Sequence, residues 1–236
     1  MELLVVNVNT TASMTQRIAE SAEAAASAGT RVTGLTPRFG AESVEGNFES
    51  YLAAVAVMDA VTAYTEPYDA VVLAGFGEHG IEGLRELVGV PAIDITEAAA
   101  MLALPLGRAY SVVTTLDRTV PLIEDRLRLS GLIDRCASVL ATGRPVLDLE
   151  DDSAVEAIAA TAREAVDRDR AEVICLGCGG MAGVAEAVSA VVGVPVVDPI
   201  AAAVRVAESL HGLGLRTSKA RTFAAPRPKT ITGWPL

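Results

Sequence analysis

The stretches VVLAGFGEHG (residues 71–80) and ICLGCGGMAG (residues 174–183) decide the fold, because they describe one local structure twice. Each starts with an apolar run typical of a buried strand and continues into a glycine-rich turn ahead of a helix. When the two are aligned, Gly75 lies opposite Cys178. In both copies a similar segment follows, GVPAID (89–94) and GVPVVD (193–198), displaced by one residue. The chain is therefore predicted to contain two related halves.

The repeat extends toward the start of each half, where LLVVNVNTTASMT (3–15) matches YSVVTTLDRTV (110–120). Short β-branched runs alternate with Ala/Glu-rich stretches, a pattern typical of parallel sheets covered by helices. Helices are predicted over 12–28, 48–64, 121–140 and 153–169, the last with a capping box of Ser153 and Glu156.

The predicted fold class is α/β, with two pseudo-symmetric lobes, each a small parallel sheet flanked by helices. Residues 1–105 form the first lobe, with 212–236 packing back on it, and residues 106–211 form the second. Ligands of parallel sheets bind at the carboxyl ends of the strands. One active site is therefore expected between the lobes.

Composition favours a small-molecule ligand. The 236 residues are 51% hydrophobic and only 4% aromatic, and the net charge is −11. Nucleic-acid binding needs basic patches, so no nucleic-acid partner is expected. No apolar run reaches the ~18 residues of a membrane span, and the start lacks the basic region of a signal peptide. A cytoplasmic protein without a membrane partner is expected.

A metal site is not predicted either. The three cysteines include one Cys175-x-x-Cys178 pair, but no second pair completes a zinc site. The two histidines, His79 and His211, are distant in sequence.

Five short sequence motifs are spread in order along nearly the whole chain. They are VNVNTTASMT (6–15), SVEG (43–46), SVVTTLDRT (111–119), LGCGGM (176–181) and GLGLRTSK (212–219). Together they resemble the aspartate/glutamate/hydantoin racemase superfamily, and within it the hydantoin racemases most. The resemblance implies an isomerase of two α/β lobes that uses no cofactor. It also implies two cysteines on opposite faces of the substrate's stereocentre, and a homo-oligomer is expected.

The chain departs from that family at the first cysteine. The family motif reads C-F-G-D-P-G, whereas this chain has GFGEHG, so Gly75 replaces the cysteine and His79 stands for the proline. Glu78 stands for the aspartate, and Val8 replaces another usual proline. A vacancy about the size of a CH₂SH group is expected beside Gly75.

Cys178 is the main catalytic candidate. Racemisation without a cofactor needs a base on one face of the substrate and an acid on the other. A thiol suits this role if its pKa falls toward neutrality, and the Gly179 and Gly180 N–H groups are expected to face a developing enolate oxygen. Cys175 is interpreted as core. Cys136 is interpreted as part of a helical packing stripe with Leu129, Leu132, Ile133 and Leu140.

His79 is the candidate for the second proton carrier, four residues after Gly75. Glu78 is a weaker candidate, and the alternative is that both merely solvate the loop. Polar groups after a strand suit a ureide or carboxylate, although one of them is expected to cap the next helix. The substrate-binding candidates are Asn9, Thr10, Gly75, Phe76, Gly77, Thr114, Thr115, Gly179 and Gly180, with Asn7 and Thr11 beside them. The basic residues of the tail are expected to be solvated, with Lys219 as the exception worth testing.

The leading functional prediction is a racemase of 5-monosubstituted hydantoins. The first alternative is a decarboxylase of arylmalonate type, because such decarboxylases resemble this chain in keeping only the second cysteine. The second alternative is a ligand-binding module, or a variant altered in its second base.

Overall fold

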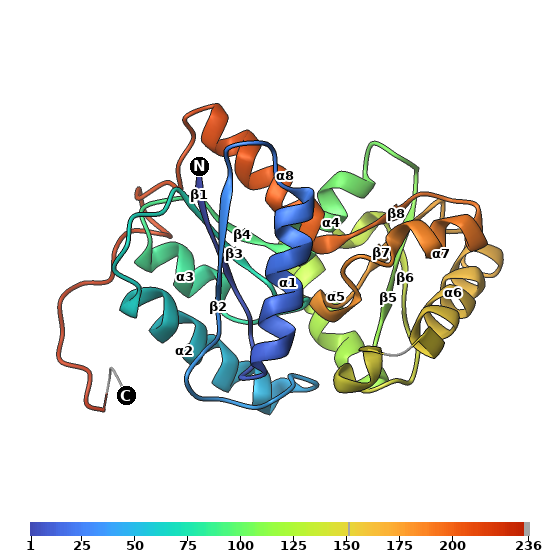
Figure 1. Ribbon diagram of the computed structural model, residues 1–236, viewed down its shortest axis with the longest axis horizontal. Coiled ribbons are helices and arrows are strands. Elements are labelled where there is room, and N and C mark those ends of the chain that lie inside the picture. The colour runs from blue at the N-terminus through green and yellow to red at the C-terminus, as the bar shows by residue number, and fades with distance from the viewer. Residues whose placement is uncertain (151, 234–236) are drawn as a thin grey trace.

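The computed structural model describes residues 1–150 and 152–233, which form two lobes side by side (Figure 1). Each lobe contains one four-stranded parallel sheet, with the orders β2-β1-β3-β4 and β6-β5-β7-β8. The first sheet comprises β1 (Glu2–Val6), β2 (Arg31–Leu35), β3 (Ala70–Leu73) and β4 (Ala92–Asp94). The second comprises β5 (Tyr110–Thr114), β6 (Cys136–Ala141), β7 (Val173–Leu176) and β8 (Val196–Val197). The identical strand orders confirm the predicted fold class.

Four helices follow the strands in each half of the chain. The first half has α1 (Ala12–Ala25), α2 (Asn47–Ala63), α3 (Ile81–Leu87) and α4 (Ile95–Ala103). The second half has α5 (Val120–Leu129), α6 (Asp152–Asp167), α7 (Ala185–Val192) and α8 (Pro199–Gly212). Short 3₁₀ turns cover Asp117–Thr119, Ile133–Arg135, Val146–Glu150 and Gly179–Met181. α6 begins one residue before the predicted cap, so Ser153 lies inside its first turn.

The repeat is also visible in the helix caps. Asp94 begins α4 by accepting hydrogen bonds from two backbone N–H groups, those of Thr96 and Glu97. Asp198 does the same at the start of α8. A carboxylate at an N-cap satisfies N–H groups that the helix itself leaves unpaired. The two GVP segments of the repeat therefore end in equivalent strand-to-helix junctions.

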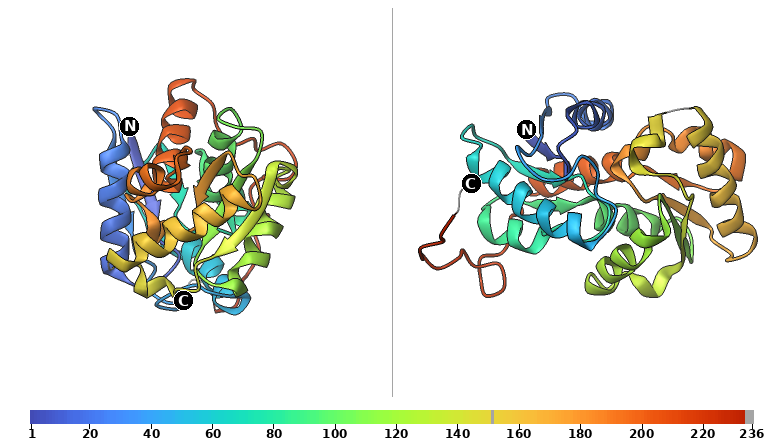
Figure 2. Two further views of the ribbon diagram at one scale, coloured as in Figure 1. Left: turned by 90° about the vertical axis from the view of Figure 1, so that its right-hand side faces the viewer. Right: turned by 90° about the horizontal axis from the view of Figure 1, so that it is seen from below.

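A continuous apolar core joins the lobes. α2 and α3 cover the outer face of the first sheet, and α6 and α7 cover the outer face of the second. α1, α4, α5 and α8 lie between the sheets, and the two lobes remain distinct when seen from below (Figure 2). α8 packs on β3 and β4 of the first sheet, while α4 packs on β7 and β8 of the second. The last helix of each half therefore covers the sheet of the other half.

The helix predicted over 121–140 is wrong in its second part. α5 ends at Leu129, and Gly131 adopts φ +72°, a conformation that glycine tolerates best at a helix end. The Leu132 N–H then bonds to the Leu127 carbonyl at 2.8 Å and closes the turn. The chain continues into β6, an edge strand, and Cys136 therefore lies in a strand and not on a helical stripe.

The tail that follows α8 lies along the first lobe. Lys219 Nζ donates to the carbonyls of Arg85 at 2.6 Å and Glu86 at 3.0 Å, at the end of α3. A cation at a helix C-terminus interacts favourably with its unpaired carbonyls. Arg85 also lies 5.7 Å from the ring centroid of Phe223. Lys219 is thus a structural contact of the tail.

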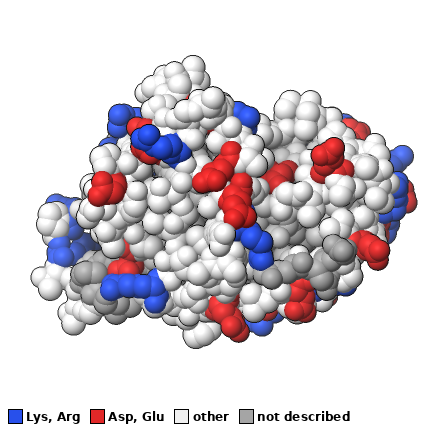
Figure 3. Space-filling view, viewed as in Figure 1, with Lys and Arg blue, Asp and Glu red and all other residues white. Residues whose placement is uncertain are grey.

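Acidic and basic side chains are interspersed on the face shown in Figure 3, without a continuous basic area there. Among the described residues, no helix combines the length and apolar character needed to cross a membrane.

Candidate active site

A small pocket of about 40 Å³ lies between the lobes, at the carboxyl ends of β1, β3, β5 and β7. These are the two central strands of each sheet, from which the chain leaves in opposite directions, and such points favour ligand binding. The pocket is lined by Asn7, Val8, Asn9, Met14, Ile18, Val44, Ala74, Gly75, Phe76, His79, Thr114, Thr115, Thr119, Val146, Gly177, Cys178, Gly179 and Gly180.

Most of the residues predicted from the sequence lie in this lining, but Thr10, Thr11, Gly77 and Glu78 do not. The hydroxyl of Thr10 donates to the Ala41 carbonyl at 3.2 Å, and the N–H of Gly77 bonds to Thr96 Oγ1 at 2.8 Å. Both residues therefore shape the neighbouring backbone. The lining also contains apolar side chains that the sequence did not single out, including Ile18, Val44 and Val146.

Cys178 lies two residues after the end of β7, at the start of a 3₁₀ turn. Its sulfur accepts a hydrogen bond from the Gly180 N–H at 3.4 Å, so this N–H faces the thiol and not a substrate oxygen. Burial raises the pKa of the Cys178 thiol to about 11, although the N–H groups of Gly180 and Met181 favour the thiolate. The condition that this pKa falls toward neutrality is therefore not met in the structure. Cys178 rests there as a proton-bearing thiol.

The other two cysteines lie elsewhere. Cys175 is fully buried in β7, and its thiol approaches the Ala99 carbonyl at 3.6 Å. Cys136 is partly buried in β6, where burial raises the pKa of its thiol to about 12. Neither lines the pocket, so both are small packing residues.

No vacancy exists beside Gly75. A Cβ built on this residue would overlap Cδ2 of His79 and Cγ1 of Val8. These are the residues that stand where the family has prolines, so the space expected for a thiol is filled by their side chains. The glycine at residue 75 is therefore a packing requirement of its neighbours.

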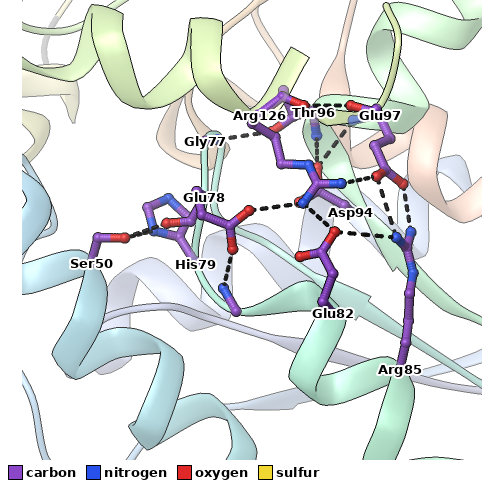
Figure 4. A network of polar contacts seen from close by, with 12 residues as sticks. Ser50, Gly77, Glu78, His79, Glu82, Arg85, Asp94, Thr96, Glu97 and Arg126 are labelled. Atoms are coloured by element: carbon purple, nitrogen blue, oxygen red, sulfur yellow. Dashed lines mark hydrogen bonds and ion pairs between the residues drawn. The ribbon is translucent and has the colours of Figure 1, made fainter. Parts of the chain in front are cut away.

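His79 is buried with both ring nitrogens engaged. Nδ1 lies 3.1 Å from Ser50 Oγ (Figure 4). Nε2 lies 3.2 Å from the Phe76 carbonyl. Burial lowers the pKa of His79 to about 4, against the opposing hydrogen bond to Phe76. The imidazole is therefore neutral near pH 7 and lies in the pocket wall beside Gly75.

The segment from Gly75 to Gly80, here called the site loop, is held by an arginine of the other lobe. Arg126 on α5 is 2% exposed, and its Nη1 lies 2.8 Å from Glu78 and 2.6 Å from Glu82. Its Nη2 also pairs with Glu97 on α4, which in turn pairs with Arg85 (Figure 4). Burial works against ionisation of Glu97, but Arg85 and Arg126 hold its pKa below the usual value.

Arg126 was not predictable as a site residue from the sequence pattern. A charged residue on a predicted helix is usually solvated. The available signal was its position on the apolar face of α5, next to the buried Ile123 and Leu127.

The polar groups of the first lobe form a compact cluster. Asn7 Nδ2 donates to Asn9 Oδ1 at 2.8 Å and to Thr15 Oγ1 at 3.0 Å, and Asn9 Oδ1 also receives the Thr11 N–H at 3.0 Å. These bonds fix the turn before α1. In the second lobe the Thr114 hydroxyl donates to the Gly177 carbonyl at 3.1 Å and ties β5 to β7. Thr115, the residue after β5, also lines the pocket.

Among the residues whose side chains the structure describes, no group of three or more His, Cys, Asp or Glu is placed to hold a metal ion. The pocket combines one thiol, one neutral imidazole and several amide and hydroxyl groups. Such groups suit proton transfer to and from a small polar molecule.

Comparison with known proteins agrees with this geometry. The profile of the Asp/Glu/Hydantoin racemase family matches residues 3–207. The chain is 36% identical over 233 residues to a hydantoin racemase from Paenarthrobacter aurescens, covering 97% of this chain and 99% of that protein.

Solved structures are similar as well. A crystal structure of allantoin racemase from Pseudomonas fluorescens superposes with a TM-score of 0.97 at 67% identity, covering 99% of this chain and 100% of that one. Arylmalonate decarboxylase, at 18% identity and a TM-score of 0.60 over 94% of this chain and 99% of that one, shares the fold alone. The chain therefore belongs to the Asp/Glu/Hydantoin racemase family, and it is a racemase and hence an isomerase.

Proposed function

We propose that the protein racemises 5-monosubstituted hydantoins without a cofactor, and that allantoin, a hydantoin with a ureido group at C5, is its preferred substrate. The similarity to an allantoin racemase at 67% identity over nearly the whole chain supports this choice. The C5 proton of a hydantoin is acidified by the adjacent carbonyl group, so a weak base in a dry pocket is sufficient to remove it. The amide and hydroxyl groups around Asn9 and Thr115 match the ring's N–H and C=O groups.

Two groups on opposite sides of the pocket exchange the proton. Gly75 and Cys178 occupy equivalent strand ends in the two lobes, and the His79 ring fills the space beside Gly75. Cys178 then serves one face of C5 and His79 the other. In one direction neutral His79 removes the proton and the Cys178 thiol returns one to the opposite face, which leaves an imidazolium and a thiolate. In the other direction this thiolate removes the proton and the imidazolium returns one. The Gly180 N–H stabilises the thiolate that forms in the first direction.

One observation carries the proposal: Cys178 is the one cysteine in the pocket lining, and Gly75, Phe76 and His79 of the site loop line the same pocket. The same observation favours decarboxylation of an arylmalonate as the second candidate, because one thiol is enough to protonate one face.

The test uses polarimetry. Each pure enantiomer of allantoin and of 5-benzylhydantoin is incubated with the protein, with and without a chelator, and phenylmalonate is assayed for carbon dioxide release. Loss of optical rotation that the chelator does not change, with no carbon dioxide from phenylmalonate, is expected. Decarboxylation that is faster than racemisation would contradict the proposal.

A further inference from the structure

The SVEG segment (residues 43–46), which lies between β2 and α2, borders the pocket in the first lobe. Val44 is partly exposed and lines the pocket, so the pocket wall meets solvent there. In the second lobe Val146 lines the same pocket, at the start of the 3₁₀ turn Val146–Glu150. Segments of both lobes therefore meet at this edge of the pocket.

Glu45 links these two segments by a hydrogen bond, here called the clasp. Its Oε1 accepts the Val146 backbone N–H at 2.9 Å, although the two residues are 101 positions apart in the chain. A bond from a backbone N–H to a carboxylate is charge-assisted and stronger than one between neutral groups. Beside it, the guanidinium of Arg118 occupies the space into which a side chain at residue 46 would extend, so Gly46 lets the second lobe approach closely.

The pocket in this closed arrangement is too small for the proposed substrate. Its volume of about 40 Å³ has room for only a few water molecules, and a hydantoin ring with its carbonyl oxygens needs more. Substrate can therefore enter only when part of the wall moves. The clasp joins two parts of this wall next to the partly exposed Val44, so it must break for the two segments to separate.

We propose that Glu45 is a positioning residue that holds the two lobes closed over the pocket through the clasp, and that substrate enters when the clasp opens. The inference rests on the proposed function only for the identity of that substrate. Glu45 is not part of the pocket lining, and it acts through Val146 and the closed wall that keeps water from the reacting C5 atom.

The charge of Glu45 has a separate effect that a test must distinguish from the clasp. Burial is the main cause of the raised pKa of the Cys178 thiol, and the nearby charge of Glu45 raises this pKa further. Loss of the carboxylate would therefore make the thiol more reactive even if the pocket opened no more often.

Alkylation of Cys178 by iodoacetamide, located by tandem mass spectrometry, measures how often the pocket opens and needs no substrate. Glu45→Ala and Glu45→Gln both remove the charge, but only Glu45→Gln keeps a side-chain oxygen that accepts the Val146 N–H. Cys178 should therefore react faster in Glu45→Ala than in Glu45→Gln by about fivefold or more, the effect of one net hydrogen bond on the open population.

Val146→Pro tests the clasp from its other end, since proline has no N–H and is tolerated at the start of a helical turn. The charge of Glu45 stays in this variant, so it is compared with wild type, and alkylation of Cys178 should be faster by about tenfold or more. Glu42→Ala is the matched control, because Glu42 is an exposed carboxylate of the same loop. Cys175, fully buried in β7, reports unfolding and should stay unmodified in every variant.

Turnover of allantoin tests whether the clasp opens for substrate. The bond is present in the free protein and in the closed complex in which the proton moves, but it is broken in the open complex through which substrate enters. Relative to Glu45→Gln, Glu45→Ala should therefore lower kcat and KM together by about threefold or more, and it should change kcat/KM by less than about twofold.

The outcomes separate the two proposals. Equal alkylation of Cys178 in Glu45→Ala and Glu45→Gln, or in Val146→Pro and wild type, would overturn the clasp whatever the activity. A KM that rises in Glu45→Ala, as expected of a distorted substrate site, would overturn its part in substrate entry. Alkylation that changes as expected in a protein that racemises no hydantoin would confirm the clasp and contradict the proposed function.

Discussion

The imidazole ring of His79 occupies the space into which a side chain at residue 75 would extend. Val8 encloses the same space from β1's end, so a glycine at residue 75 and bulky residues at 8 and 79 form one packed unit. In the family pattern a cysteine and two prolines stand at these three places. The chain has therefore replaced a thiol by a glycine together with the side chains that fill its volume.

Adding a thiol at residue 75 should consequently destabilise the protein. Gly75→Cys would force the Cβ into His79 and Val8, and overpacking of this kind typically costs about 1–3 kcal/mol in the free energy of unfolding. Urea denaturation measures the change. The triple variant Val8→Ala/Gly75→Cys/His79→Ala lacks both obstructing side chains. It should therefore exchange the C5 hydrogen faster than the double variant Gly75→Cys/His79→Ala. Equal stability of Gly75→Cys and wild type would show that the site loop moves freely.

Cys178→Ser should lose racemisation by at least ~10²–10⁴-fold while remaining folded, because a hydroxyl is a far weaker acid and base than a thiol. Polarimetry measures the rate, and circular dichroism checks the fold. Cys136→Ala is the control, since Cys136 lies in β6 away from the pocket. An inactive, folded Cys136→Ala together with a normal Cys178→Ser would contradict the assignment of the site.

His79→Ala should slow hydrogen exchange of one hydantoin enantiomer by ~10²–10⁴-fold and affect the other much less. Cys178→Ser should show the opposite preference. The comparison variant is His211→Ala, because His211 lies in the last turn of α8 outside the pocket. Equal slowing of both enantiomers by His79→Ala would argue that the ring only packs against Gly75.

Arg126→Met should destabilise the fold by about 3 kcal/mol, the lower end of the range for breaking a buried ion pair, since Glu78 and Glu82 each keep 36% side-chain exposure. Arg128→Met removes a charge from the same helix, but Arg128 is 53% exposed and pairs only with solvated carboxylates, so its change should stay within about 0.5 kcal/mol. Chemical denaturation of both variants makes the comparison. Similar stabilities would show that the Arg126 network contributes little.

Stability should also depend on the protonation of Asp94. Burial, followed by the nearby charge of Glu97, raises the pKa of Asp94 from 3.8 to about 7, although Arg126 opposes the shift. Between these values the folded protein keeps a proton that the unfolded chain has lost. The stability from this group is therefore present below about pH 4 and is lost as the pH rises toward 7.

Asp94→Asn keeps an N-cap acceptor for Thr96 and Glu97 but cannot titrate. Its unfolding free energy should fall less than that of wild type between pH 5 and 7, as measured by denaturation at each pH. Asp198→Asn, at the equivalent cap of α8, is the reference variant. Parallel pH profiles of Asp94→Asn and wild type would exclude this role for Asp94.

The sequence predicted the features of the fold that depend on the internal repeat and on the alternation of strands and helices. The two glycine turns after β3 and β7 located both lobes and the position of Cys178, because local pattern controls strand ends and turns. The helix predicted from the same local pattern was wrong after Leu129. Gly131 ends α5 there, although the helical spacing of apolar residues continues. One residue with a left-handed backbone outweighed a helical pattern.

The electrostatics of the site were not predictable in the same way. The pKa of Cys178 depends on how deeply the closed pocket buries its sulfur, and the contact between Arg126 and Glu78 joins residues 48 positions apart on different lobes. The filling of the space beside Gly75 depends on Val8, which lies on another strand end. Each of these features arises from side chains that meet only after both lobes have assembled.

The exchange of α4 and α8 between the sheets has a consequence for synthesis of the chain. α8 covers β3 and β4 of the first sheet, yet it ends at Gly212, more than 100 residues after β4. When the N-terminal half leaves the ribosome, one face of its sheet is still without this helix. Domains generally fold as units in the order of their translation, but here one face of the first sheet must wait for α8, the last helix in the described part of the chain. A nascent chain that is released before α8 has been made would therefore expose the apolar surface of the core that lies between the two sheets.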